Sequence, residues 1–211
     1  MMIGYRLVRG LVYGLSRLLW RIRFVGLDRL PRTGPYVLAP SHRSNLDSFF
    51  AALVTSRRVR FMAKQEIWKS KFLGRAAEYL GAFPVDRAMA DRTALRTAAA
   101  CLVAGEPLVV FPEGTRRHGP VIEDLHDGAA YLAARQGVPV VPVGIGGSEE
   151  ILSKGRKLPK LHRVVVVVGE PIEPPRREGS AVPRSEVKAL TADIGTAIQK
   201  AFDEARALLG R

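Results

Sequence analysis

The hydrophobic positions of this chain change their spacing repeatedly, and each change predicts a switch between helix and strand. Apolar residues three and four positions apart are typical of amphipathic helices, whereas short apolar runs without alternation are typical of strands buried on both faces. The helical spacing covers residues 1–23, 48–56, 68–80, 91–104, 127–136 and 185–209. The strand-like runs cover residues 23–26, 36–39, 59–63, 82–85, 107–111, 138–145 and 164–168. This order predicts an α/β fold, a single domain with a mixed, largely parallel sheet flanked by helices.

Glycine, proline and acidic residues mark several of the predicted boundaries. Asp91 is of the residue type that caps a helix start, and Gly105 follows the end of the same predicted helix. Residues 170–184 are rich in proline and charge and predict a loop. The run Gly-Ile-Gly-Gly at 144–147 resembles a dinucleotide-binding loop. Because Glu149 occupies the place of the third glycine, this run predicts a turn after a strand instead.

Residues 1–23 predict a basic amphipathic helix that precedes the sheet. Its apolar residues recur at three- and four-residue steps and are interrupted by Arg6, Arg9, Arg17, Arg21 and Arg23. Only seven residues between Arg9 and Arg17 are free of charge. A membrane span needs about 20 apolar residues, so this segment predicts no transmembrane helix. It also lacks the small-residue cleavage site of a signal peptide.

The residue types at the ends of this helix suit a membrane surface. Arginines near both apolar ends, together with Tyr13 and Trp20, are typical of a helix that lies in the headgroup layer. The alternative is a helix packed on its own domain with its arginines in water. The first interpretation predicts a membrane-surface helix at 1–23 and an α/β domain at 24–211. It also predicts a peripheral protein at the cytoplasmic face of a membrane.

The overall charge favours anionic partners. The 211 residues include 33 Lys and Arg against 20 Asp and Glu, which gives a net charge of +13 and a pI near 10.6. Such a field favours nucleic acid, anionic lipid or a phosphorylated substrate and does not choose among them. The single cysteine, Cys101, excludes an intrachain disulfide and a Cys-cluster metal site. Its alanine-rich surroundings predict a buried apolar role, and this cysteine usage fits a reducing, cytosolic compartment.

The stretch Ser-His-Arg-Ser-Asn-Leu-Asp at 41–47 carries a candidate catalytic pair. It joins two apolar runs, 36–40 and 49–54, so His42 lies where a strand gives way to a helix that Asp47 opens. Asp47 can cap that helix, or it can accept a hydrogen bond from an imidazole that folds back over the turn. A histidine held by a carboxylate is the general-base half of a triad without its nucleophile, so it would activate a hydroxyl of the substrate. The alternative is a chance spacing, with Asp47 as a cap and His42 as an ordinary loop residue.

Three further predicted strands end in cations. Arg87 and Lys64 each follow a strand, and the stretch Phe-Pro-Glu-Gly-Thr-Arg-Arg at 111–117 follows a third. Open α/β sheets bind ligands at the carboxyl edge of their strands. Arg116 offers a fork of N–H donors to a phosphate, and Glu113 can accept a hydrogen bond from a polyol hydroxyl. A solvated surface charge is the alternative for each residue taken singly, but three strand ends together favour a phosphorylated substrate.

Four stretches in this order resemble the motifs of the glycerolipid acyltransferases, the lysophosphatidic acid acyltransferase-like group. They lie at residues 41–47, 81–87, 111–116 and 138–143. The third is the specific part, because Phe-Pro-Glu-Gly-Thr-Arg matches the family motif residue for residue. The sequence departs from the family at Ser41, where many members have Asn, and at 125–128, which reads Leu-His-Asp-Gly instead of Phe-Lys-x-Gly. Both departures bear on the acceptor more than on the chemistry.

The resemblance implies transfer of an acyl chain from a thioester, acyl-CoA or acyl carrier protein, to the free hydroxyl of lysophosphatidic acid. The product would be phosphatidic acid for phospholipid synthesis, and glycerol 3-phosphate or another lysolipid stays open as the acceptor. The resemblance implies that His42 is the base and that Asp47 orients it. It places the phosphate and the glycerol of the acceptor near Arg87, Arg116, Glu113, Gly114, Thr115 and Lys64. It implies no metal and no cofactor besides the thioester co-substrate, with a membrane surface as the partner.

Other classes of function stay open at this point. One cluster of possible metal ligands matches no metal motif, namely His118, Glu123, Asp124 and His126. Ser41 beside His42 suggests a hydrolase, but no Gly-x-Ser-x-Gly nucleophile elbow is present. The remaining rival is a non-catalytic module that binds anionic lipid or nucleic acid through its basic face, although no nucleic-acid motif accompanies the arginine pairs.

Overall fold

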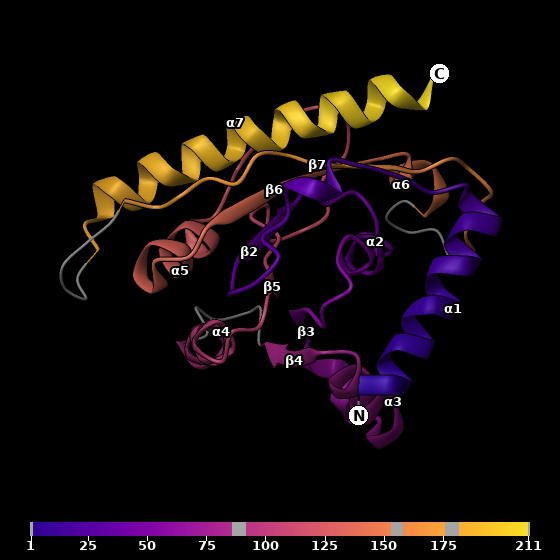
Figure 1. Cartoon of the computed structure of the whole chain (residues 1–211), viewed down its shortest axis with the longest axis horizontal. Helices are drawn as coiled ribbons and strands as arrows, with labels where there is room; N and C mark the ends of the chain where they lie inside the picture. The colour runs from indigo at the N-terminus through magenta and orange to yellow at the C-terminus, as the bar shows by residue number, and fades with distance from the viewer. Residues whose placement is uncertain (1, 86–91, 153–157, 176–181, 211) are drawn as a thin grey trace.

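Helices and strands alternate along the computed structural model much as the hydrophobic spacing predicts (Figure 1). The structure describes residues 2–85, 92–152, 158–175 and 182–210. The strands are β1 (Arg23–Val25), β2 (Val37–Pro40), β3 (Arg60–Lys64), β4 (Ala82–Val85), β5 (Leu108–Val109), β6 (Val140–Gly146) and β7 (Val165–Val168). The α-helices are α1 (Met2–Trp20), α2 (Asp47–Leu53), α3 (Lys71–Tyr79), α4 (Arg92–Val103), α5 (Gly128–Gln136), α6 (Ser148–Ile151) and α7 (Arg184–Leu209). Two short 3-10 helices complete the described elements, η1 (Leu27–Arg29) and η2 (Gln65–Lys69).

The described strands form one seven-stranded sheet in the order β1-β7-β6-β2-β5-β3-β4. Five neighbouring strands, β6, β2, β5, β3 and β4, run parallel to one another. Strand β7 pairs antiparallel with β6, and β1 runs parallel to β7. The prediction of a mixed, largely parallel sheet flanked by helices is therefore confirmed.

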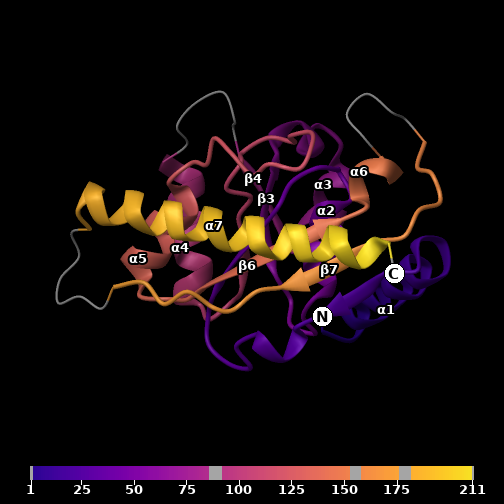
Figure 2. The ribbon, with the colours of Figure 1, turned by 90° about the horizontal axis from the view of Figure 1, so that it is seen from above.

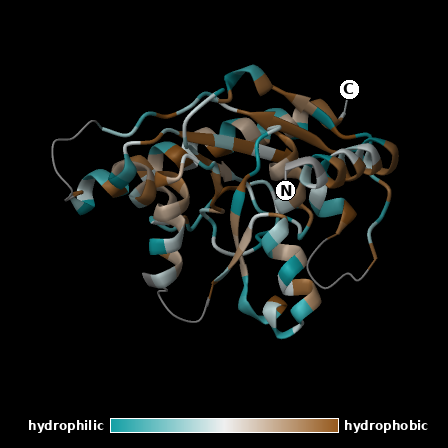
Figure 3. Cartoon of the chain, turned by 60° about the horizontal axis from the view of Figure 1, so that its bottom comes forward, coloured by the Kyte–Doolittle hydropathy of each residue, from teal (hydrophilic) through white to brown (hydrophobic). Residues whose placement is uncertain are grey.

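Both faces are buried at β2, β5, β6 and β7, which explains why these strands lack polar–apolar alternation. Val37 and Ala39 of β2 face one core, which is completed by α4, α5 and α7. Leu38 between them faces a second core, which is completed by α2 and α6. Consecutive strand residues point to opposite sides of a sheet, so a strand covered on both sides needs apolar residues at every position. Hydrophobic residues accordingly fill the central strands, whereas the helices carry residues of both kinds (Figure 3).

Helix α7 lies across β6 and β7 (Figure 2). Two glycines of β6 allow its close approach. A Cβ at Gly144 would clash with the backbone of Ala201, and a Cβ at Gly146 would lie 3.0 Å from the carbonyl carbon of Ala205. The glycines of this run therefore serve helix packing. Gly147, with a φ of 86°, then turns the chain into α6, in agreement with the predicted turn after a strand.

The strand register aligns the ends of four parallel strands. Leu38 of β2 pairs with Val109 of β5, and Val109 pairs with Phe61 of β3. Phe61 in turn pairs with Ala82 of β4. Because these strands are parallel and lie in one row, the residues that follow them meet at the same carboxyl edge of the sheet.

This carboxyl edge holds the predicted site residues that the structure describes. The stretch 41–47 follows β2, the stretch 111–117 follows β5, and Lys64 is the last residue of β3. Arg87, which follows β4 in the sequence, lies outside the described residues. The predicted helix cap Asp91 lies outside them as well.

A few boundaries differ from those that the spacing predicts. Helix α3 begins only at Lys71, because η2 forms first, whereas the spacing predicts one helix over 68–80. The loop predicted at 170–184 contains one short pairing, since the backbones of Ile172 and Val140 exchange two hydrogen bonds. The sequence analysis missed η1 and α6, because helices of three or four residues are too short to show a hydrophobic period.

Helix α1 packs one face on the domain and leaves the opposite face open. Tyr5 and Ser16 are buried. The Arg9 guanidinium donates hydrogen bonds to the carbonyls of Thr55 (2.8 Å) and Leu53 (3.0 Å). The other side of the helix carries three exposed leucines, Leu7 (70% exposed), Leu11 (64%) and Leu18 (76%). No helix among the described residues is long and apolar enough to cross a membrane, as predicted for this segment.

Candidate active site

The imidazole of His42 lies against the carboxylate of Asp47 in the turn that follows β2. His42 Nδ1 is 3.1 Å from Asp47 Oδ2, and both side chains are buried. An ionised carboxylate only accepts hydrogen bonds, so we place the proton on Nδ1. His42 Nε2 then carries the lone pair and is able to accept a proton.

The carboxylate of Asp47 folds back over this turn instead of capping α2. Its Oδ2 also accepts hydrogen bonds from the backbone N–H groups of Arg43 and Ser44, each at 2.6 Å. Helix α2 begins at Asp47, its N-cap residue is Leu46, and no side-chain cap bond forms there. Of the two interpretations of Asp47, the structure therefore shows the carboxylate that accepts from the imidazole.

Phe111, which follows β5, fixes the plane of the imidazole. Its ring stacks on that of His42 with the centroids 4.1 Å apart and an interplanar angle of 28°. The sequence analysis did not assign a role to Phe111. The available signal was its place at the head of the Phe-Pro-Glu-Gly-Thr-Arg stretch.

The carboxylate of Glu113 holds the backbone on which His42 is mounted. Its Oε2 accepts a hydrogen bond from the His42 N–H (2.8 Å), and its Oε1 accepts one from Arg43 Nη1 (2.6 Å). Only 1% of Glu113 is exposed. Burial raises the pKa of this carboxyl above its ordinary value, although the hydrogen bonds and charge of Arg43 oppose the shift. The sequence analysis expected a polyol hydroxyl as the partner of Glu113, whereas both oxygens bond within the protein.

Arg43 is a buried cation that the sequence analysis missed. Its guanidinium is 1% exposed and, besides Glu113, donates to the carbonyls of Gly119 (3.0 Å) and Val121 (2.8 Å). It also lies 5.0 Å from the ring centre of Phe202 in α7. Arg43 thereby joins the turn after β2 to the loop after β5 and to α7. The signal in the sequence was an arginine inside the His-x4-Asp stretch, where a solvated charge is the usual interpretation.

The remaining predicted residues of the 111–117 loop stay close to the surface. Thr115 is exposed and Arg116 is half-buried. Gly114 has a φ of 62°, and a Cβ there would lie 2.6 Å from the His126 ring, so both the turn and the ring favour glycine. Arg117 donates its backbone N–H to the carbonyl of His42 at 2.9 Å. The loop is thus fixed at the base of the site and open at its rim.

Lys64 ends β3 with an exposed side chain at the same edge of the sheet. The aligned strand register places it near the two loops, but it makes no contact that joins it to His42 or Arg116 among the described residues. Arg87, the second predicted phosphate ligand, is outside the part of the chain that the structure describes. The structure therefore brings His42, Asp47 and Glu113 into direct contact.

Ser41 is buried and its hydroxyl has a structural partner. Its Oγ accepts a hydrogen bond from the backbone N–H of Ile145 at 3.0 Å. This bond ties the end of β2 to β6. Ser41 thus lacks the exposed, base-coupled hydroxyl that a serine hydrolase requires.

Two residues of the possible metal-ligand cluster, His118 and Asp124, have structural partners. His118 Nδ1 lies 2.8 Å from Glu149, and Asp124 pairs with Arg117 at 3.1 Å. No group of three possible metal ligands occurs within the described ranges. Cys101 is buried in the core with α4, α5 and α7, as its alanine-rich surroundings predicted.

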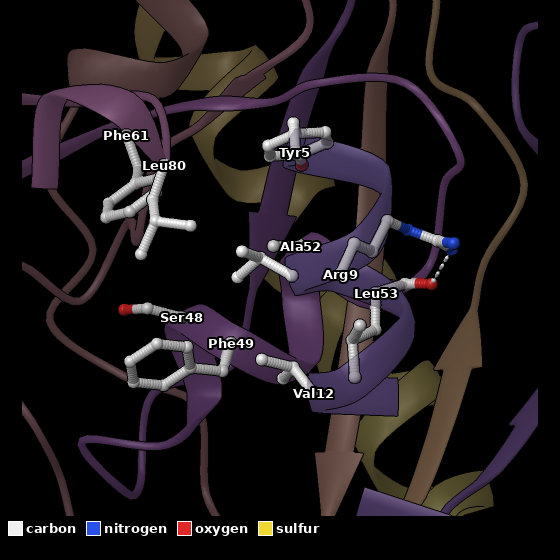
Figure 4. Close-up of a pocket in the computed structure, with 10 residues that line it drawn as sticks. Tyr5, Arg9, Val12, Ser48, Phe49, Ala52, Leu53, Phe61 and Leu80 are labelled. Atoms are coloured by element: carbon white, nitrogen blue, oxygen red, sulfur yellow. Dashed lines mark hydrogen bonds between the residues drawn. The ribbon is translucent and has the colours of Figure 1, made fainter. Parts of the chain in front are cut away.

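An apolar pocket of about 70 Å³ lies between α1 and α2 (Figure 4). Tyr5 and Val12 line it from α1, and Phe49 and Ala52 line it from α2. Leu80, at the end of α3, closes another side. Because α2 begins at Asp47, this pocket borders the helix that carries the carboxylate in contact with His42.

Residues 21–146 match the sequence model of the acyltransferase family, which covers more than half of the chain. The chain belongs to the acyltransferase family. The matched region contains all four motif stretches and the whole of the His42 site. The family resemblance drawn from the sequence is therefore confirmed.

Individual acyltransferases show the extent of the similarity. The 1-acyl-sn-glycerol-3-phosphate acyltransferase of Bacillus subtilis is 28% identical over 152 residues, which are 72% of this chain and 73% of that protein. The enzyme of that name from Streptococcus pneumoniae is 31% identical over 176 residues, which are 80% of this chain and 62% of the relative. The crystal structure of the 1-acyl-sn-glycerophosphate acyltransferase from Thermotoga maritima shares the fold, with a TM-score of 0.75 and 24% identity over 97% of this chain and 80% of that one.

Proposed function

We propose that this acyltransferase moves a fatty acyl chain from an acyl thioester to the free hydroxyl of lysophosphatidic acid and makes phosphatidic acid. The observation that carries the proposal is the buried His42–Asp47 pair at the ligand-binding edge of the sheet. The relatives named 1-acyl-sn-glycerol-3-phosphate acyltransferase support the choice of acceptor. The thioester is acyl-CoA or acyl carrier protein, and no further cofactor is required.

In this mechanism the acceptor, not the protein, supplies the nucleophile. His42 Nε2 takes the hydroxyl proton while the hydroxyl oxygen attacks the thioester carbonyl. Asp47 holds the tautomer and stabilises the imidazolium that forms. The tetrahedral intermediate then breaks its C–S bond, and the imidazolium returns the proton to the leaving thiolate. Each cycle thus restores neutral His42 without an acyl-enzyme.

Glu113 acts in this proposal as a positioning residue. Its two oxygens hold the His42 backbone and the Arg43 guanidinium, so it sets where the imidazole stands. The contacts to the acceptor fall to half-buried Arg116 for the phosphate and to exposed Thr115 and Gly114 for the glycerol. The family resemblance adds Arg87 as a second phosphate ligand. Lys64 adds positive charge at the same edge.

The apolar pocket beside α2 suits the acyl part of a substrate. Its walls are aliphatic and aromatic, and apolar pockets favour apolar chains because burial removes them from water. We place part of the acyl chain in this pocket, beside the helix that begins at Asp47. The pocket would then link chain binding to the position of that helix.

We further propose that α1 docks on the membrane surface where the lipid substrates reside. Its exposed leucine stripe consists of Leu7, Leu11 and Leu18, which face away from the domain. Exposed Arg6 and Arg17 flank this stripe and suit anionic headgroups. The proposal is therefore a peripheral protein at the cytoplasmic face, where acyl thioesters are supplied.

The direct test is thiol release from acyl-CoA in the presence of lysophosphatidic acid, followed by mass spectrometry of the lipid product. Phosphatidic acid that forms with wild type and is lost with His42→Ala supports the proposal. A parallel reaction with glycerol 3-phosphate or other lysolipids decides the acceptor. Salt-sensitive binding to lipid or DNA without any thiol release would favour a non-catalytic binding module instead.

A further inference from the structure

A second concentration of arginines lies beside the edge strand β4, away from the His42 site. Arg58, Arg60 and Arg75 line a cleft of about 560 Å³ together with Tyr79 and residues 82–84. Arg60 begins β3, whereas the active-site edge lies at the other end of that strand. The residues that line this cleft belong to neither the 41–47 nor the 111–117 stretch, and residues 82–84 form the strand part of the 81–87 stretch, before Arg87.

Carboxylates neutralise the charge of this cleft only in part. Arg58 donates to the backbone carbonyl of Glu78 at 2.6 Å, so this bond leaves its charge uncompensated. Arg60 Nε lies 3.8 Å from Glu106, near the limit for an ion pair. Glu78 contributes one lining carboxylate against three guanidinium groups. The forked donors of arginine and the net positive charge together suit a phosphate group.

Exposed apolar residues border this arginine cleft. Phe72 lies one helical turn before Arg75 on α3 and is 79% exposed, and the adjacent Leu73 is 54% exposed. The start of α1 touches the cleft on another side, because a Cβ at Gly4 would clash with the hydroxyl of Tyr79. Figure 1 shows the N-terminus of α1 beside α3. The cleft therefore lies next to the helix that we place on the membrane surface.

We propose that the arginine cleft binds the phosphate group of an anionic phospholipid, at a site separate from that of the acyl acceptor. Phe72 and Leu73 place the cleft at the level of the headgroups, and the guanidinium groups bind the phosphate there. This inference rests on the proposed membrane docking of α1 for the source of the ligand. Free phosphate has the same chemistry, so the test distinguishes the two sources.

The test compares vesicles of phosphatidylcholine with vesicles that also contain phosphatidylglycerol, using the full chain without an acyl donor. For Arg58→Gln combined with Arg75→Gln we expect affinity for the anionic vesicles to fall about 30-fold, since each cation near such a surface contributes roughly fivefold. The matched control is Lys188→Gln combined with Lys200→Gln on α7, a helix that Figure 1 shows on the opposite side of the molecule from α3 and β4. We expect this pair to lose only about twofold, because salt screens charges beyond about 10 Å.

Equal losses from the two pairs would overturn the proposal, because the effect would then come from net charge alone. Calorimetry then measures the binding of inorganic phosphate. The proposal is also overturned if the wild type binds inorganic phosphate and the double arginine variant does not, while both bind the anionic vesicles with the same affinity. Thermal unfolding checks that the double arginine variant folds. If it does not, the single change Arg75→Gln at an exposed residue carries the test, with an expected loss of about fivefold in affinity for the anionic vesicles.

The vesicle measurement needs no turnover. A failure of the proposed acyl transfer therefore leaves this result intact. If the wild-type protein does not bind the neutral vesicles, this result counts against the docking of α1 instead.

Discussion

The two sides of the active site are built differently. The base side consists of buried residues joined by hydrogen bonds of 2.6–3.1 Å, namely His42, Arg43, Asp47 and Glu113. The side that we propose for the acceptor presents exposed Lys64 and Thr115 and half-buried Arg116 at the rim. The fold thus fixes the base before any substrate binds, whereas the groups proposed for the phosphate remain accessible.

This contrast predicts different consequences for substitutions on the two sides. A change on the base side should lower kcat or the free energy of unfolding, because it alters a preorganised and buried arrangement. A change on the acceptor side should mainly raise the KM for the acceptor, because it removes a contact made only when the ligand is bound.

His42→Ala should have the largest effect on the chemical step. We expect kcat to fall by about 10²–10⁴, since general-base help is worth that much, with the thermal unfolding temperature little changed. Thiol release under saturating substrates measures this effect. The matched control is His162→Ala, which replaces an exposed histidine and should keep full activity. Near-normal turnover of purified His42→Ala would remove the base from the mechanism.

Arg43→Met should show that the base side is held by a buried ion pair. It leaves the Glu113 carboxylate buried without its cation, which should cost about 3–5 kcal/mol of the free energy of unfolding. Urea denaturation measures this loss. In a double-mutant cycle with Glu113→Leu the two losses should not add, because the two residues share one interaction. Fully additive losses would contradict the pairing.

Arg116→Ala should affect the acceptor side and leave the base alone. We expect the KM for lysophosphatidic acid to rise by about 10- to 100-fold, as for the loss of a charged hydrogen bond of roughly 1.5–3 kcal/mol. The kcat and the unfolding temperature should change little. Arg135→Ala, at an exposed arginine of α5, serves as the control. An unchanged KM for a phosphorylated acceptor would take Arg116 out of this role.

Leu18→Gln should weaken membrane binding without touching either side of the site. Leu18 is 76% exposed on the open face of α1. If this side chain enters the membrane, the variant should lose roughly 1.5–3 kcal/mol of binding free energy. Sedimentation with phosphatidylcholine vesicles measures this as about a tenfold or larger fall in partitioning. Val103→Gln, at a residue 77% exposed on α4, should have no effect. Equal effects of the two changes would argue against docking through α1.

The sequence predicts the fold and the contact between His42 and Asp47, because both depend on local patterns. Apolar runs without alternation indicate the doubly covered sheet, and the His-x4-Asp spacing brings His42 and Asp47 together within one turn. The role of Arg43 depends on partners about 70 or more positions away, among them Glu113. The backbone function of Glu113 and the stacking of Phe111 arise in the same way, through the pairing of β2 with β5. Such contacts leave no periodic signal in one sequence.

The central claim is that the acceptor hydroxyl is the nucleophile and that His42 only moves its proton. The most direct measurement mixes enzyme at substrate-like concentration with acyl-CoA and no acceptor, then follows thiol release and the mass of the intact protein. We expect no rapid thiol burst and no added acyl mass, with thiol release beginning when lysophosphatidic acid is added. A stoichiometric burst together with an acylated protein would contradict it.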